Sequence, residues 1–227
     1  MPGDEATRFE WLSTGESGLA AMLEAIASAR QSVGLEIYMF HAGGVGDRFR
    51  AELAAAARRG VRVRVLVDAF GSLELPRGYL DEVTQAGGDV RWFNPLELGR
   101  LSYRDHRKLL VVDDRVAFVT CFNISQEYDG DGIERGFRDV GVRLGGESVA
   151  PLVQSFHGMF GAASFRHRRL SRFRRHLKPQ RIATPEGDLF MLSPGRGRNP
   201  ARDQLVADIG RSRRIRLATA YLLLPRK

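Results

Sequence analysis

The stretch from Val61 to Val67 constrains the fold of this chain more than any other feature of its sequence. It reads Val-Arg-Val-Arg-Val-Leu-Val, so apolar and basic residues alternate at first and every position is apolar at the end. Alternation with a period of two is typical of a β-strand, and a continuous apolar run is typical of a strand covered on both faces. The sequence therefore predicts a strand that enters a sheet covered by helices.

Helix and strand signals alternate on both sides of this stretch. The predicted helices, inferred from apolar spacing and from capping or breaking residues, are 19–26 with Ser17 as N-cap, 47–59 with Asp47 as N-cap before Gly60, and a helix opened by Pro76 and closed at Gly87. The predicted strands are 33–40, 61–67 and 89–93. This β-α-β-α-β order places the chain in the α/β class and favours a parallel, helix-covered sheet.

Two further apolar stretches, 107–113 and 116–122, follow in the second half of the chain. Only Asp114 and Arg115 separate them, so we predict a hairpin with a two-residue turn. The remaining predicted elements, inferred from the same signals, are a strand at 137–144, a helix at 148–160, a helix from Asn199-Pro200 to about residue 210, and a strand at 215–224.

The positive charge of the chain is concentrated in one segment. The sequence has 35 Lys and Arg residues against 27 Asp and Glu residues, a net charge of +8. Eight basic residues and no acidic one lie between Arg166 and Arg181, and the remaining 27 basic residues balance the acidic ones. Such a cluster attracts anionic lipid headgroups or a nucleic acid backbone, and the alternative is a solvated linker between two halves.

Composition excludes several classes of protein. Of the 227 residues, 43% are hydrophobic and 27% are charged, which is typical of a globular protein. The single cysteine, Cys121, cannot form an internal disulfide and fits a reducing compartment. No apolar run is long enough to cross a bilayer, and the acidic N-terminus lacks the pattern of a signal peptide. We therefore predict a cytoplasmic protein, or one bound peripherally to the inner face of the cell membrane.

One pair of residues suggests phosphate chemistry. His106 and Lys108 are two apart in a predicted strand and should face the same side. With a two-residue turn at 114–115, antiparallel pairing places Asn123 opposite His106 and Cys121 opposite Lys108. This set suits a phosphate group, with the lysine as point charge, the amide as donor and the histidine as nucleophile or proton carrier. The alternative is a solvated strand end with a structural histidine.

The residues around this pair resemble a known family. The run His106–Asp113, followed by Phe122-Asn123, resembles the HKD motif (H-x-K-x-x-x-x-D) of the phospholipase D superfamily. Wider matches, which resemble bacterial cardiolipin synthases, are Leu35–Phe40, Ala57–Val63, Leu66–Asp68 with Phe70-Gly71, Ile124 with Glu127-Tyr128, and Arg138-Asp139. The resemblance covers roughly residues 17–160 and resumes near residue 199. It implies a mixed sheet flanked by helices, duplicated, with one HKD motif from each half at a shared site.

The resemblance also implies a mechanism. The histidine of one motif attacks phosphorus to form a phosphohistidine, the histidine of the other protonates the leaving alcohol, and water or a second alcohol resolves the intermediate. No metal or other cofactor is needed, because lysine and asparagine side chains hold the phosphate charge. Carried onto this chain, the catalytic set is His106, Lys108, Asp113 and Asp139, and Lys108 and Asn123 bind phosphate. Asp139 matches the carboxylate that fixes the histidine tautomer, and Asp113 is expected to act structurally near the hairpin turn.

Three departures from the family pattern bear on activity. Asp114 replaces the usual glycine after the motif, and Thr120-Cys121 replaces a pair of small residues, which narrows the space for phosphate. Cys121 as a nucleophile is a weaker reading than a buried, inert thiol. A second HKD motif is absent from these residues, so we predict either that the chain is one part of a longer enzyme or that two chains pair and each contributes His106.

The sequence predicts a division into a first phospholipase D-like domain at 1–165, a basic linker at 166–182 and the start of a truncated second domain at 183–227. A weak echo of residues 25–38 at 207–221 supports this division, as does the similarity of 221–225 to the first strand of the family's second half. Truncation is preferred to pairing because a self-sufficient domain has no reason to start a second half.

The leading functional hypothesis is phosphatidyl transfer of the cardiolipin synthase type on an anionic, phosphatidylglycerol-like phospholipid at a membrane surface. One alternative is a phospholipase D-type phosphodiesterase or nuclease completed by dimerisation, although nucleic acid is the less favoured partner. Another is a non-catalytic membrane-binding protein with a decayed site. The missing motif and Thr120-Cys121 are the observations that favour this last reading.

Overall fold

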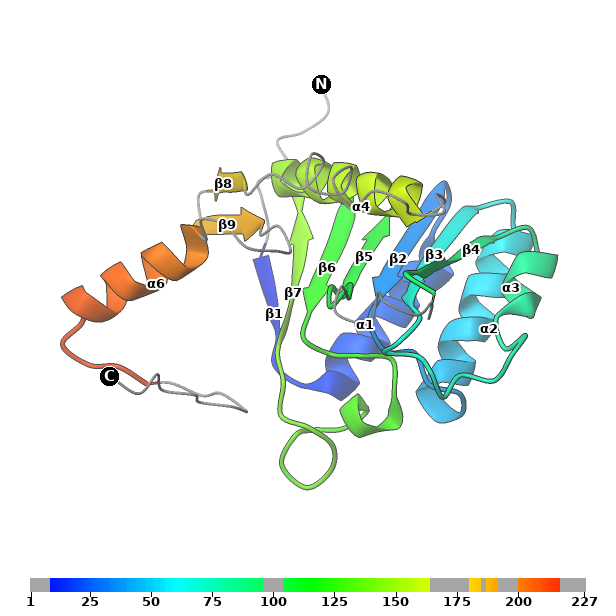
Figure 1. Cartoon of the computed structure of the whole chain (residues 1–227), viewed down its shortest axis with the longest axis horizontal. Helices are drawn as coiled ribbons and strands as arrows, with labels where there is room; N and C mark the ends of the chain where they lie inside the picture. The colour runs from blue at the N-terminus through cyan, green and yellow to red at the C-terminus, as the bar shows by residue number, and fades with distance from the viewer. Residues whose placement is uncertain (1–8, 96–103, 164–179, 185–186, 192–199, 217–227) are drawn as a thin grey trace.

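A computed structural model of the chain describes residues 9–95, 104–163, 180–184, 187–191 and 200–216. Seven strands form one sheet in the order β1-β7-β6-β5-β2-β3-β4 (Figure 1). The strands are β1 (Phe9–Leu12), β2 (Ser32–Ile37), β3 (Arg62–Asp68), β4 (Asp89–Phe93), β5 (Leu109–Val112), β6 (Val116–Thr120) and β7 (Gly141–Gly145). The helices are α1 (Gly15–Ser28), α2 (Gly44–Arg58), α3 (Asp81–Gln85), α4 (Val149–Ala163) and two short 3-10 turns, Gln126–Tyr128 and Gly146–Ser148.

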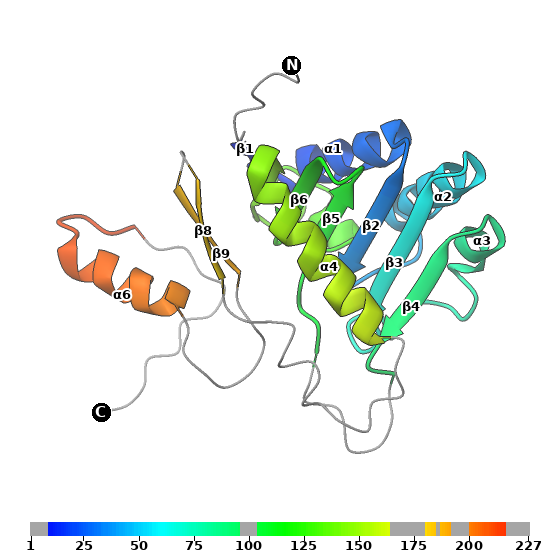
Figure 2. The ribbon, with the colours of Figure 1, turned by 90° about the horizontal axis from the view of Figure 1, so that it is seen from above.

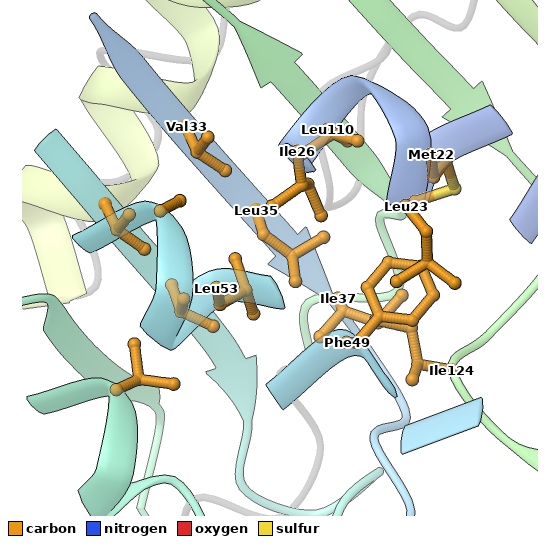
Figure 3. Close-up of a cluster of buried hydrophobic side chains, with 14 of the residues drawn as sticks. Met22, Leu23, Ile26, Val33, Leu35, Ile37, Phe49, Leu53, Leu110 and Ile124 are labelled. Atoms are coloured by element: carbon orange, nitrogen blue, oxygen red, sulfur yellow. The ribbon is translucent and has the colours of Figure 1, made fainter. Parts of the chain in front are cut away.

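Helices cover both faces of the sheet, as the apolar end of the Val61–Val67 stretch predicts. α1, α2 and α3 lie on one face and α4 lies on the other (Figure 2). Val63, Val65 and Val67 belong to the larger buried cluster beneath α1 and α2, part of which Figure 3 shows. Leu66 belongs to the second cluster, beneath α4. The alternation of side chains along β3 therefore divides its residues between two cores.

The sheet is mixed. β2, β3 and β4 run parallel and are joined by α2 and α3, which confirms the predicted β-α-β-α-β order. β5 pairs antiparallel with β2, and β6, β7 and β1 continue antiparallel from there. Gly34 in β2 lies against Phe156 of α4, and a Cβ atom there would come within 2.5 Å of that ring. The α/β class with a mixed sheet flanked by helices is therefore confirmed, and β1 is an addition that the sequence patterns missed.

Three predicted helix starts are wrong by a few residues. α1 begins at Gly15, and its N-cap is Thr14, whose hydroxyl accepts a hydrogen bond from the Ser17 N–H at 3.2 Å. Asp47 does not cap α2 but lies inside its first turn, and α3 begins at Asp81 rather than at Pro76. In each case a polar residue or proline near the helix start has a local role other than the expected one, which spacing alone cannot reveal.

The predicted two-residue hairpin turn is also wrong. β5 and β6 pair Val112 with Val116, so the turn has three residues and the register differs by one from the prediction. Asp113 still bonds to the β2 side, because its N–H donates to the Ser32 carbonyl at 2.8 Å in the register of β2 and β5, but it does not pair with β6. Asp113 and Asp114 both adopt positive φ angles, 53° and 55°. Lys108 consequently lies opposite Thr120, whose N–H donates to the Lys108 carbonyl at 3.1 Å, and not opposite Cys121.

The described C-terminal residues form a small hairpin and a helix. β8 (Gln180–Thr184) pairs antiparallel with β9 (Gly187–Met191), so a hairpin crosses the predicted boundary between residues 182 and 183. α6 (Pro200–Arg211) begins at the predicted proline. Most of the basic segment and the predicted strand beyond residue 216 lie outside the described residues, and the domain division stays a prediction. Within the described ranges, no helix has both the length and the apolar character required to cross a membrane.

Candidate active site

The segments that carry the predicted site residues meet at one edge of the sheet. β5 runs antiparallel to β2, β6 to β5, and β7 to β6. The chain therefore leaves β2, β3 and β6, and enters β5 and β7, at the same edge (Figure 1). This edge receives His106 and Lys108 before β5, Asn123 after β6 and Asp139 before β7. The topology thus brings together four predicted residues that are up to 33 positions apart in the sequence.

His106 and Lys108 form the centre of the site. Lys108 Nζ lies 3.2 Å from His106 Nδ1 and donates to the His106 carbonyl at 2.9 Å. The two residues belong to an irregular segment before β5 rather than to a strand, so a folded-back lysine and not strand periodicity brings them together. Burial and the nearby Lys108 charge lower the pKa of His106. The imidazole is therefore neutral at pH 7, the form that can act as a nucleophile.

Lys108 is a buried cation without a carboxylate partner at contact distance. Lys108 is only 6% exposed, and none of the ion pairs among the described residues includes its ammonium group. Burial lowers the pKa of Lys108 to about 8, although the charges of Cys121, Asp105, Asp139 and Asp68 act in the opposite direction. A buried ammonium group that is not neutralised by a direct ion pair is suited to an incoming phosphate.

Tyr38 is a site residue that the sequence patterns did not assign. Its ring centroid lies 4.4 Å from that of His106, with the planes tilted by 49°. Lys108 Nζ lies 5.1 Å from the same ring centroid, which is a cation–π distance. Tyr38 follows β2, and its half-buried ring forms an aromatic wall for both residues. Its place within the matched stretch Leu35–Phe40 was the only signal in the sequence.

Asn123 is buried and oriented by the backbone. Its Oδ1 accepts a hydrogen bond from the Met39 N–H at 3.2 Å, and its amide also interacts with the Tyr128 hydroxyl. Oδ1 can only accept, so any hydrogen bond that Asn123 donates to a phosphate comes from its NH2 group. This orientation is compatible with the predicted role of Asn123 as a hydrogen-bond donor to phosphate.

Asp139 lies beside Cys121 rather than against the imidazole. Its Oδ1 accepts from the Val140 N–H at 3.0 Å, and its carboxylate interacts with the Cys121 thiol and with the Lys108 charge. No described hydrogen bond joins it to His106. Cys121 is exposed, not buried as expected. Partial burial and the Asp139 charge raise the pKa of its thiol, so the thiol is protonated at neutral pH and a poor nucleophile.

Asp113 lies at the opposite end of β5 from His106. Its carboxylate accepts hydrogen bonds from the N–H groups of Arg30, Gln31 and Ser32 at 3.0, 2.7 and 2.9 Å. Partial burial raises the pKa of Asp113, but these donors outweigh that effect and hold the pKa below its ordinary value. The side chain therefore ties the hairpin turn to the connection between α1 and β2.

The described residues also contain no group of three or more His, Cys, Asp or Glu side chains arranged to hold a metal ion. The described side chains at this edge include the neutral imidazole of His106, the buried ammonium of Lys108, the amide of Asn123, the carboxylate of Asp139 and the ring of Tyr38.

We expect sulfate to bind at Lys108 about tenfold more tightly at pH 7 than at pH 9. The pKa of Lys108 is about 8 and only the ammonium form attracts an anion, so affinity falls as the pH rises through that value. Sulfate keeps one charge state across this range, and isothermal titration calorimetry gives the affinity. Lys108→Met should remove the pH dependence, whereas Lys178→Met, a matched loss of one lysine, should retain it. An affinity that does not change with pH in the wild-type chain would contradict the prediction.

Comparison with known proteins agrees with this geometry. A family model described as "Cardiolipin synthase, PLD-like domain" matches residues 22–130. Cardiolipin synthase B of Salmonella typhi is 37% identical over 155 residues, which cover 66% of this chain and 38% of that protein. The major cardiolipin synthase ClsA of Bacillus subtilis is 34% identical over 161 residues, 69% of this chain and 33% of that protein. The chain thus spans less than half of the length of these curated relatives.

A solved structure agrees in fold. Nuc from Salmonella typhimurium, a phospholipase D family member, matches with a TM-score of 0.51 at 18% identity, covering 69% of this chain and 94% of that chain. The family model includes the whole His106–Asp113 motif and Asn123. Cardiolipin synthases are among the sequence relatives of this chain. The matched sequence, the mixed sheet and the pairing of His106 with Lys108 together show that the chain belongs to the phospholipase D superfamily.

Proposed function

We propose that this chain supplies one catalytic half of a phosphatidyltransferase of the cardiolipin synthase type. The observation that carries the proposal is the neutral imidazole of His106 held 3.2 Å from the unpaired, buried ammonium of Lys108. The sequence similarity to cardiolipin synthases supports an anionic phospholipid as substrate. In this proposal residues 1–165 form the first half, 166–182 a basic linker that approaches the membrane surface, and 183–227 the start of a second half.

The proposed reaction has two displacements at phosphorus. A lone pair of the His106 imidazole attacks phosphorus, and the bond from phosphorus to the leaving alcohol oxygen breaks as that oxygen takes a proton from a second acid. An acceptor alcohol then gives up its proton and attacks the phosphohistidine, which breaks the bond between nitrogen and phosphorus and frees His106. Lys108 and Asn123 bind the non-bridging oxygens and stabilise the charge that develops on them.

The second acid is the part of the proposal that these residues do not supply. His106 is one imidazole, and both steps need a proton donor or acceptor opposite it. A second HKD motif from the other half of a longer protein would provide this group, and a second copy of the chain would provide its own His106. We propose the first arrangement, because the curated relatives are more than twice as long as the matched region.

Incubation of the purified full-length protein, which in this proposal contains both halves, with phosphatidylglycerol vesicles tests the function. We expect conversion of phosphatidylglycerol to cardiolipin with release of glycerol, followed by thin-layer chromatography and mass spectrometry of the lipids. Cleavage of DNA in the presence of EDTA, without lipid turnover, would instead identify a nuclease. Vesicle binding that His106→Ala leaves unchanged, with turnover of neither substrate, would identify a membrane-binding protein with a decayed site.

A further inference from the structure

Glu36 is the most unusual buried group of the described structure. It occupies the centre of the sheet in β2, paired with Leu66 of β3 and Leu109 of β5, and it is 0% exposed. Neither of its carboxyl oxygens accepts a hydrogen bond from an N–H or O–H donor of the described residues. A charged carboxylate is very costly to bury in this way, so its presence calls for an explanation.

The groups that face Glu36 come from the segment that carries His106. Arg107 Nη1 lies 3.4 Å from Glu36 Oε1, and the Asp105 carboxyl, which is 5% exposed as a residue, interacts with it directly. Asp105 and Arg107 flank His106 in the sequence. The Asp105 carboxyl in turn accepts from the Arg107 N–H at 3.3 Å. Glu36 therefore contacts the residues on both sides of the proposed nucleophile.

The remaining contacts of this segment are also polar and local. The Asp105 N–H donates to Asp68 Oδ2 at 2.8 Å, and Arg107 Nη2 donates to the Ser155 hydroxyl of α4 at 2.9 Å. Arg104 Nη1 lies 3.9 Å from Asp68 Oδ1. Residues 104–108 form no regular strand, so no backbone ladder fixes this segment. The polar contacts of Arg104, Asp105 and Arg107 hold it in place instead and thereby position His106.

The two neighbouring buried carboxyls, Glu36 and Asp105, indicate one bound proton. Three carboxyl groups, Glu36, Asp68 and Asp105, lie near the guanidinium groups of Arg104 and Arg107, and the Lys108 ammonium also acts on both aspartates. Burial raises the pKa of Glu36 well above its ordinary value and also raises that of Asp105. One proton shared by the neighbouring Glu36 and Asp105 carboxyls removes the repulsion between two buried carboxylates in contact.

We propose that Glu36 is a positioning residue for His106, and that its carboxyl shares one proton with Asp105 to hold the Asp105–Arg107 segment in place. The role of His106 rests on the proposed function, but the protonated pair itself does not. With one shared proton, the Glu36 and Asp105 carboxyls form a hydrogen bond instead of repelling each other. Arg107 contacts Glu36 and donates to the Ser155 hydroxyl, and so connects this pair to α4. Loss of the proton at high pH places two negative charges together and is expected to loosen the segment and displace His106.

Replacement of Glu36 by Gln and by Leu tests this role. Glutamine keeps the shape and a donor for Asp105, so we expect the NMR titration midpoint of the His106 imidazole to stay within about 0.2 units and kcat within about twofold. Leucine removes the bond, so we expect a displaced His106 resonance and a roughly tenfold lower kcat with an unchanged KM. Glu24→Gln, on the exposed surface of α1, is the matched control and should change none of these quantities.

Two further measurements report the proton directly. One side-chain carboxyl carbon in a 13C-labelled Glu sample should keep the chemical shift of the protonated form at pH 7 and disappear in Glu36→Gln. An acid whose pKa is raised in the folded state binds more protons folded than unfolded, so its contribution to stability falls as the pH rises. The difference in urea midpoint between Glu36→Gln and the wild-type chain should therefore shift in favour of Glu36→Gln as the pH rises from 5 to 9.

An ordinary carboxylate shift for Glu36 at pH 7 would overturn the proposal, as would equal effects of Gln and Leu on His106. If Glu36→Leu does not fold, the carboxyl resonance and the Glu36→Gln comparison decide the outcome. None of the NMR or stability readouts needs turnover. A chain that lacks transferase activity but shows the protonated pair and the displaced His106 resonance would contradict the proposed function and support the positioning role.

Discussion

In the full-length protein, replacement of His106 by Ala is expected to abolish turnover of phosphatidylglycerol and of the model diester bis(4-nitrophenyl) phosphate, with a fall in kcat of about 10^4-fold or more. The imidazole is the proposed nucleophile, and no other described group at this edge can replace it. The thiol of Cys121 is protonated because burial and the Asp139 charge raise its pKa. The fold should persist, because the described side-chain contacts of His106, with Lys108 and Tyr38, lie at the site and not in the buried core. Circular dichroism and the urea midpoint would verify this.

His157→Ala is the matched control for this prediction. His157 is also partly exposed, and burial and the charge of a neighbouring cation, Arg64, lower its pKa as they do for His106. It lies on α4, with Nδ1 3.4 Å from Arg64, far in the sequence from the HKD motif. We expect unchanged kcat and KM. If His106→Ala keeps more than about one hundredth of wild-type turnover, a different group is the nucleophile and the proposed mechanism is wrong.

The sequence predicted the partners in this site better than the way in which they meet. His106 and Lys108 do face each other, but through an irregular segment and not through a strand of period two. The predicted register failed by one residue because the turn has three residues, of which Asp113 and Asp114 adopt positive φ angles. Strand signals report the local chain, whereas the register of a hairpin depends on the length and backbone conformation of its turn.

Glu36 and Tyr38 show what kind of signal was missed. Both lie in the predicted strand 33–40 and in the family match Leu35–Phe40, but neither signal predicts a site role for them. A single acidic residue inside a strand predicted to be buried is itself a sign of an unusual environment, because an isolated buried carboxylate is costly. The identity of its neighbours depends on the packing of β3, β5 and α4, and no local pattern in the sequence contains this information.

Asp113→Ala is expected to lower the free energy of unfolding by about 2–3 kcal/mol without a change in kcat while the protein is folded. The carboxylate accepts three backbone hydrogen bonds from residues 30–32, which are worth roughly 1 kcal/mol each before discounting for their exposure to water. Alanine at a φ of 53° adds roughly 1 kcal/mol of strain. Urea denaturation gives the free energy, and the diester assay below the unfolding transition gives kcat.

Asp114→Ala separates the two contributions. Asp114 has nearly the same φ, 55°, but its carboxylate is not among the described acceptors, so alanine there should cost only the strain of roughly 1 kcal/mol. The lowered pKa of Asp113 adds a pH signature. A depressed acid stabilises the fold above its unfolded pKa of about 4, so the gap between wild type and Asp113→Ala should shrink as the pH falls through that region. Equal decreases in the free energy of unfolding for the two variants would contradict the structural role of the Asp113 carboxylate. A catalytic loss in folded Asp113→Ala as large as that of His106→Ala would place this aspartate in the chemistry instead.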